Sequence, residues 1–256
     1  MIELDAATVL LQWSVGGMLG CWFTTRRREV GVGYGWLLRI IYLLMAGAAA
    51  WIGLAGEGGA ATRTRDVVSL TVAAVCAAGL AISVGRRSRG NEGFPVILDA
   101  VPFALGVVGL VAAGVDAGGA DGTAVVRTVV GAVFLGFVSD AMLLGHWYLV
   151  QPGLPRRHVN EIVRAFLWVW PVEVMVMILP TGMFSVFSGT VDDGWSGQLG
   201  WFWAACAATT GILGFVTLRA LKERSYSAVM AATGLMYLAI LTAFGTDLVA
   251  RAVLAG

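Results

Sequence analysis

A carboxylate and an imidazole six residues apart are the most distinctive chemical groups in this chain. Asp140 and His146 lie in residues 139–155, near the end of a long apolar stretch that closes with a proline-rich turn. On a regular helix, residues six apart are displaced by about 9 Å along the axis and about 120° around it, so they cannot hydrogen-bond directly. They could line one pocket from two levels, or each could pair with a neighbouring helix. Gly145 and Tyr148 would offer room and aromatic surface to a flat ligand.

Three chemistries fit this segment. His146 could donate a hydrogen bond to a quinone carbonyl while Asp140 or Asp99 handles the proton. It could instead join a proton path with Asp140 and Glu173, because imidazole and carboxylates are the usual relays. It could also be an axial haem ligand, but His158, the second histidine, falls in the following loop and disfavours haem b. The alternative without chemistry is a histidine at a helix end that bonds a carbonyl or a headgroup.

A second candidate centre is a carboxylate close to the midplane of another apolar stretch. Glu173 follows Trp168, Trp170 and Pro171. Pro171 removes a helix hydrogen bond and frees the carbonyl of Leu167, which creates a polar spot at mid-depth. Carboxylates beside broken helices bind ions or protons in transporters, yet a buried acid kept neutral explains the same pattern. Trp168 and Trp170 lie deep enough to contact a ligand.

The inner ends of the apolar stretches hold most of the unusual polarity. An ionisable side chain at bilayer depth costs about 2.5–3.5 kcal/mol on insertion scales, so it usually has a partner or a role. Glu161 and Arg164, three residues apart, are expected to form a local ion pair. No catalytic residue and no metal site is predicted. The candidate quinone or proton-site residues are Asp99, Asp140, His146, Tyr148, Glu161, Arg164, Trp168, Trp170 and Glu173.

The elements that position these residues are membrane-spanning helices. Of 256 residues, 58% are hydrophobic and 13% are charged, whereas a soluble domain is about a quarter charged. A spanning helix needs roughly 20 apolar residues. The sequence therefore predicts an all-α integral membrane protein, a single domain over residues 1–256 that forms a bundle of eight transmembrane helices. The expected spans are 6–24, 34–55, 67–85, 94–114, 123–150, 160–187, 198–219 and 226–251.

The basic residues predict the orientation of the bundle. Most of them follow the odd-numbered spans, whereas Arg63 and Arg65 fall in an even-numbered connection. Because arginine-rich loops stay in the cytoplasm, both termini are expected outside. Lys222 is the single lysine beside sixteen arginines, and alanine, glycine and valine are abundant. This composition is typical of GC-rich bacterial genomes and favours a bacterial inner membrane.

Several classes of membrane protein are excluded. A retinal protein needs a lysine inside its last spans, and di-iron desaturases need many more histidines than the two present. The topology and the Asp140–His146 region loosely resemble the quinol-interacting membrane anchors of iron–sulfur oxidoreductases. That resemblance implies a quinone pocket and partner subunits.

The first hypothesis is therefore a membrane subunit of a bacterial respiratory or other redox assembly. Such a subunit contacts quinone or relays protons from the cytoplasmic side, and its partners are the lipid bilayer and other protein subunits, not nucleic acid. The alternative is a small-solute or ion transporter that uses Glu173. A second alternative is a structural or assembly subunit without chemistry.

Overall fold

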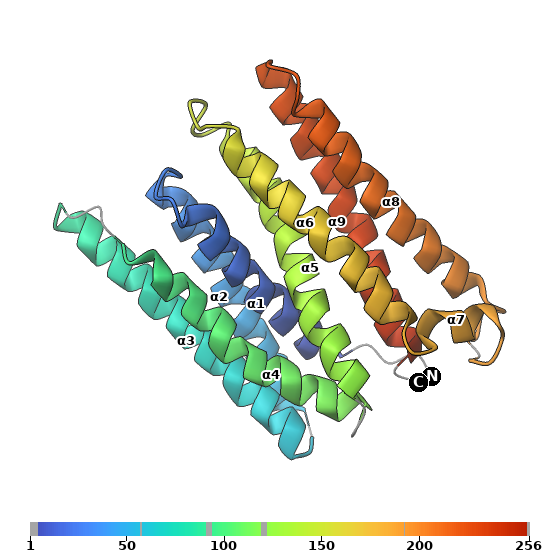
Figure 1. The fold of residues 1–256 in the computed structure, drawn as a ribbon. Coiled ribbons are helices and arrows are strands. Elements are labelled where there is room, and N and C mark those ends of the chain that lie inside the picture. Colours follow the sequence, from blue (N-terminus) through green and yellow to red (C-terminus); the bar gives the residue numbers. More distant parts are fainter. Residues whose placement is uncertain (1–4, 57, 91–93, 119–121, 192, 255–256) are drawn as a thin grey trace.

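The chain folds into long, nearly aligned helices (Figure 1). The computed structural model describes residues 5–56, 58–90, 94–118, 122–191 and 193–254, and these ranges contain helices and connections but no strand. The helices are α1 (Ala6–Thr25), α2 (Val32–Ala55), α3 (Ala60–Ser88), the 3₁₀ turn η1 (Val96–Asp99), α4 (Ala100–Gly118), α5 (Gly122–Trp147), α6 (Arg157–Ile178), α7 (Gly182–Phe187), α8 (Gln198–Ala220) and α9 (Tyr226–Leu254).

Seven helices of the described chain are long and apolar enough to cross a membrane. They are α1, α2, α3, η1 with α4, α5, α8 and α9. The predicted multi-pass membrane character is thereby confirmed. The helix α6 runs beside the others (Figure 1) but is not among the seven. Its sequence includes Arg157, Glu161, Arg164 and Glu173, which lower its hydropathy.

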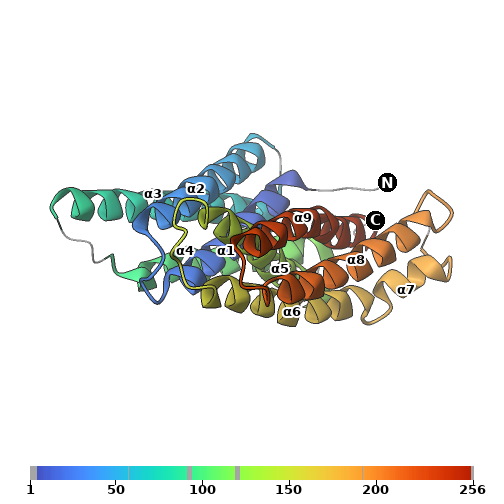
Figure 2. The ribbon, with the colours of Figure 1, turned by 90° about the horizontal axis from the view of Figure 1, so that it is seen from above.

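The centre of the bundle is the pair α1 and α5. The helix α1 packs against α2, α4 and α5, and α5 also contacts α6 and α9. Figure 2 shows α3 and α7 on opposite sides of this centre. The two central helices approach closely because glycines face each other: a Cβ built on Gly136 would lie 2.0 Å from the carbonyl carbon of Gly16. Small residues at such crossings are the usual device of membrane helices.

The connections α1–α2, α3–α4, α5–α6 and α8–α9 lie at one end of the bundle (Figure 1). We call it the arginine-rich end, because it holds Arg26, Arg27, Arg28, Arg86, Arg87, Arg89, Arg156, Arg157, Lys222 and Arg224. The helix α1 begins, and α9 ends, at the opposite end. The helices therefore alternate in direction as the sequence predicts.

The helix α3 begins at Ala60 rather than at the predicted residue 67. Its first turns include a charged pair, which the hydropathy pattern assigned to a loop. Arg65 and Asp66 are both buried, with Nη2 of Arg65 2.6 Å from Oδ1 of Asp66, and Arg65 also pairs with Asp5. Because these charges satisfy one another, the helix can include them.

The predicted span 160–187 is wrong as a single helix. The helix α6 ends at Ile178, and the short α7 follows Pro180. Proline has no N–H to continue the helical ladder. The backbone carbonyls at the end of α6 accept hydrogen bonds from Arg127 of α5 instead. Its Nε donates to the carbonyl of Val176 at 3.0 Å, and its Nη2 donates to the carbonyl of Leu179 at 2.7 Å.

Candidate functional site

Two carboxyl groups from α6 and α9 meet inside the bundle. Glu173 and Asp247 have no exposed surface, and the two groups interact electrostatically. Glu173 lies five residues before the end of α6 and Asp247 seven before the end of α9, so both are about 8–10 Å from those ends. The sequence pattern singles out Glu173 alone, whereas the structure brings a second acid beside it.

A buried amide approaches the same place from α1. Gln12 is fully buried, and its Nε2 donates to the carbonyl of Thr128 at 2.8 Å. A Cβ built on Gly131 of α5 would lie 2.9 Å from that nitrogen and 2.2 Å from Oδ1 of Asp247. Glycine at position 131 therefore leaves the space in which Gln12 and Asp247 face each other. We call Gln12, Glu173, Asp247 and Arg251 the Glu173–Asp247 cluster.

Acceptor atoms in this cluster lack donors. Within the described part of the chain, both Glu173 oxygens, Oδ1 of Asp247 and Oε1 of Gln12 are buried without a donor while both acids are ionised. The two carboxyl groups hydrogen-bond each other once one of them holds a proton. Buried polar atoms are almost always hydrogen-bonded, so several orphaned oxygens together call for an explanation. Oxygen acceptors of this kind bind a proton or a hard cation.

Arg251 supplies one positive charge to the cluster. It lies one helical turn after Asp247, and its Nη2 and Nε are 3.0 and 3.2 Å from Oδ2 of that residue. With two carboxylates and one guanidinium ionised, the cluster carries a charge of −1. Because an isolated charge is costly inside a membrane, one proton or one monovalent cation would bring the cluster to its favourable neutral state.

A further buried carboxylate lies nearer the arginine-rich end. Tyr42 of α2 donates its hydroxyl to Oδ1 of Asp140, while Oδ2 is buried without a partner. A Cβ built on Gly20 would lie 2.4 Å from Oδ2. The hydroxyl of Tyr34 is 3.5 Å from the backbone carbonyl of Asp140. Asp140 thus faces α1 and α2, where Gly20 makes room for its carboxylate.

The structure does not bring His146 to Asp140. His146 is exposed, one residue before the end of α5. Tyr148 is buried, and its hydroxyl donates to the carbonyl of Pro155 at 2.7 Å, which closes the turn between α5 and α6. The two candidates named with Asp140 are therefore not parts of one pocket with it, and Tyr148 has a structural partner.

The expected ion pair between Glu161 and Arg164 is absent, whereas Asp99 has a close partner. Glu161 pairs with two arginines of the α1–α2 connection, Arg26 at 2.9 Å and Arg27 at 2.5 Å. The two arginines hold the carboxylate of Glu161 against the α1–α2 connection, whereas Arg164 is exposed on the surface of α6. Asp99 accepts Nε and Nη2 of Arg39 at 2.8 and 2.7 Å, and both side chains are buried.

The two tryptophans near Glu173 face away from it. Trp168 is 78% exposed. Trp170 packs on α8, where its Nε1 donates to the carbonyl of Ala207 at 2.9 Å and a Cβ on Gly211 would lie 2.5 Å from its ring. Trp170 therefore serves the α6–α8 contact.

The two carboxylate sites lie at different levels of the central helices. Gln12 and Gly20, which contact them, are eight residues apart on α1, or about 12 Å along its axis. The site list from the sequence omits Gln12, Tyr42, Asp247 and Arg251. The sequence does contain features that could have predicted three of them. Gln12 is an amide inside the first predicted span, and Asp247 and Arg251 have i, i+4 spacing in the last span.

Metal chemistry and known relatives give no further guide to the site. Within the described ranges, no three His, Cys, Asp or Glu side chains gather as a metal site. No protein family, curated protein or solved structure matches the chain.

Proposed function

We propose that the chain is a multi-pass membrane protein with eight spanning helices, in which α6 is the eighth. Supporting this count, α6 runs the same course as its neighbours although it carries several charges (Figure 1). By the positive-inside rule, the arginine-rich end faces the cytoplasm. The start of α1 and the end of α9 then lie outside, in the inner membrane of a bacterium.

We further propose that the protein moves protons or a small monovalent cation through the bundle. The observation that carries this proposal is the set of donor-less buried oxygens on Glu173, Asp247 and Gln12. They come from three helices, and a single positive charge would neutralise them together with Arg251. Helix interfaces that carry buried acids are the usual location of ion sites in transporters.

Asp140 fits the same function as a second protonatable site on the path, and we call Asp140 and the Glu173–Asp247 cluster the two stations. It has one donor-less oxygen, and Tyr42 can pass or hold a proton at the other. The two stations are separated by about 12 Å along α1, as the spacing of Gln12 and Gly20 gives. A proton entering from the arginine-rich end would meet Asp140 first and the Glu173–Asp247 cluster second.

The test is ion flux into proteoliposomes that contain the purified full chain. Under an imposed membrane potential, a pH-sensitive dye inside the vesicles reports protons, and a sodium-sensitive dye reports sodium. We expect flux with the native chain and a fall to the level of empty vesicles with Glu173→Gln or Asp247→Asn. Asp116→Asn is the matched control, because Asp116 is an exposed acid at the same end of the bundle.

Two results would contradict this function. One is the absence of flux of either cation with the native chain, and the other is full flux in Glu173→Gln. Thermal unfolding of each variant shows whether a lost flux reflects a misfolded protein. A stable Glu173→Gln variant without flux supports the proposal, and a native chain without flux favours a purely structural or assembly subunit.

The second candidate is the membrane subunit of a redox assembly, with quinone near Asp140. The buried pair of Asp140 and Tyr42 favours it, because a carboxylic acid and a phenol can exchange protons with a quinone. The exposed position of His146 removes one of its expected groups. Its test is an absorption spectrum with mass spectrometry of bound small molecules, on protein extracted gently from its native membrane. Co-purified quinone that disappears in Asp140→Asn would support this candidate over the first.

A further inference from the structure

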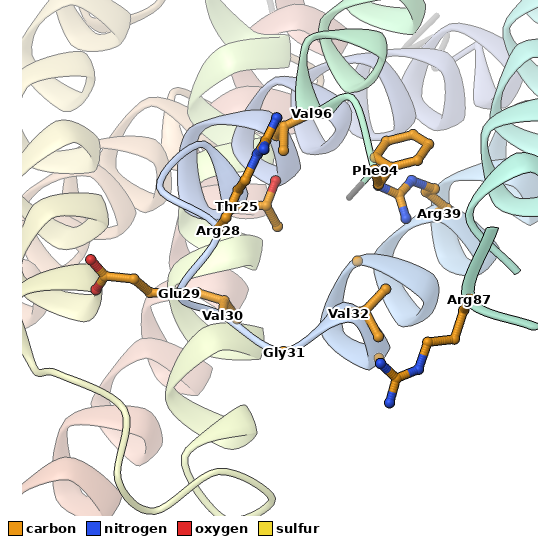
Figure 3. A pocket seen from close by; sticks show the side chains of 12 residues that line it. Thr25, Arg28, Glu29, Val30, Gly31, Val32, Arg39, Arg87, Phe94 and Val96 are labelled. Carbon is orange, nitrogen blue, oxygen red and sulfur yellow. The ribbon is translucent and has the colours of Figure 1, made fainter. Parts of the chain in front are cut away.

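A cavity of about 670 Å³ opens at the arginine-rich end, between the α1–α2 connection, α2, the end of α3 and the segment before α4 (Figure 3). Three arginines line it: Arg28, Arg39 and Arg87. Its apolar wall includes Val32 and Phe94. Neither the Glu173–Asp247 cluster nor Asp140 lines this cavity, so it is a separate feature of the molecule.

Arg39 presents an unused donor to the cavity. Its side chain is 3% exposed, Asp99 takes Nε and Nη2, and the guanidinium carbon lies 4.1 Å from the centre of the Phe94 ring. Within the described part of the chain, Nη1 is buried without a hydrogen-bond partner. Two N–H groups on this nitrogen therefore lack an acceptor within the described part of the chain.

A glycine lies next to that buried donor. Gly35 lines the cavity one turn before Arg39 on α2, and a Cβ built there would lie 3.0 Å from Nη1. Any side chain at position 35 would therefore crowd the atom. The glycine therefore avoids a tight contact with Nη1 at the wall of the cavity.

The charges of the cavity select an anion. Asp99 balances Arg39, whereas Arg28 forms no ion pair within the described ranges. Glu29 also borders the cavity, but its carboxylate points to the other side of the connection (Figure 3) and pairs with Arg157 and His158. The described lining is therefore basic, and guanidinium groups are suited to phosphate.

We propose that this cavity binds a phosphate group, held by Nη1 of Arg39 and by Arg28. The helices end at this level, where phospholipid headgroups lie, and basic pockets between helices at the cytoplasmic side bind anionic headgroups. The apolar wall suits the glycerol and upper acyl region of a lipid. A free phosphate ion has the same recognition chemistry, so the experiment separates these two sources.

The experiment uses the purified, delipidated full chain in zwitterionic detergent. The unfolding temperature is followed during titration with short-chain phosphatidylglycerol, short-chain phosphatidylcholine or inorganic phosphate. We expect a saturable increase with phosphatidylglycerol and none with phosphatidylcholine. Arg28→Gln should weaken the apparent affinity about fivefold, the usual contribution of one arginine near an anionic headgroup.

Two variants make the test specific. Gly35→Ala removes no charge but places a methyl group against Nη1 of Arg39, so it should also weaken binding. Arg89→Gln is the matched control, because Arg89 is an exposed arginine at the end of α3 that does not line the cavity. It should bind phosphatidylglycerol as the native chain does.

Saturable binding of inorganic phosphate that competes with phosphatidylglycerol would assign the site to a free phosphate ion. Binding of phosphatidylglycerol without such competition would assign it to a lipid headgroup. An equal loss in Arg28→Gln and Arg89→Gln would show general surface attraction and overturn the proposal, as would the absence of any response to both anions.

Discussion

At the scale of single residues, the buried acids are distinguished by what surrounds them. Asp99 has a bidentate arginine and Asp140 has one tyrosine, whereas Glu173 faces another acid, Asp247, with which it hydrogen-bonds when one of the two carries a proton. A fully paired buried charge needs no further partner, whereas an unpaired oxygen leaves a desolvation cost uncompensated. This difference, rather than mere burial, makes Glu173 and Asp140 the functional candidates and Asp99 a structural one.

The hydroxyl of Tyr42 is expected to stabilise the fold through Asp140. Tyr42→Phe leaves a second oxygen of that carboxyl group without a donor, which costs about 1–3 kcal/mol when the group is buried. The measurement is the free energy of unfolding in detergent, with denaturant. Tyr34→Phe is the comparison, because the Tyr34 hydroxyl bonds the side chain of Thr24 and lies 3.5 Å from the backbone carbonyl of Asp140, not from its carboxylate. Equal losses in both variants would show that Tyr42 acts through packing.

At the scale of helices, glycines determine how closely α1 and α5 pack. A Cβ on Gly136 would lie within 2.3 Å of the carbonyl of Gly16, and backbone atoms cannot yield as a flexible side chain can. Gly136→Ala should therefore destabilise the protein by about 3 kcal/mol, the upper part of the range for overpacked sites. Gly47→Ala is the control, because nothing lies within 4 Å of a Cβ at that position of α2. The unfolding temperatures of both variants in detergent test this, and a tolerated Gly136→Ala would contradict the close crossing.

An ion-pair group ties the α1–α2 connection to the start of α6. Hydrogen bonds from Arg157 and His158 lower the pKa of Glu29 from 4.5 to about 2. A carboxyl group whose pKa is lower in the folded than in the unfolded chain stabilises the folded state at any pH above its unfolded pKa. For Glu29 this stabilisation is lost as the pH falls from 4.5 toward 2. The folded protein should therefore lose this stabilisation in that acidic window.

The variant Glu29→Gln isolates this effect. Its unfolding temperature should lie below that of the native chain at pH 5, and the gap should narrow as the pH falls toward 2. Glu223→Gln is the control at the same end of the bundle, because Glu223 forms no side-chain ion pair in the described part of the chain. A gap for Glu29→Gln that does not change with pH would show that the carboxylate contributes no charge-dependent stability.

At the scale of the whole molecule, hydropathy predicts the helices but not their neighbours. The predicted starts of α1, α8 and α9 agree with the structure, because long apolar runs leave few alternatives. Which helices touch could not be predicted, since lipid and protein interiors are equally apolar and both favour the same residues. Glu173 and Asp247 meet only through the packing of α6 with α9. Asp140 and His146 do not share a pocket in the structure, because six residues along α5 turn the two side chains to different faces of the helix.

The number of crossings is tested most directly at α6. Gly153 lies exposed in the α5–α6 connection and Ser188 is exposed after α7. If α6 crosses the membrane, cysteines placed at these two positions must react with a membrane-impermeant maleimide from opposite sides. The positive-inside rule adds the direction: in intact cells Ser188→Cys should label, and Gly153→Cys should label only after permeabilisation. The native cysteines are buried, so they add little background. Labelling of both variants from one side would make α6 a helix that does not span, and would leave Glu173 without the membrane depth that its role in ion movement requires.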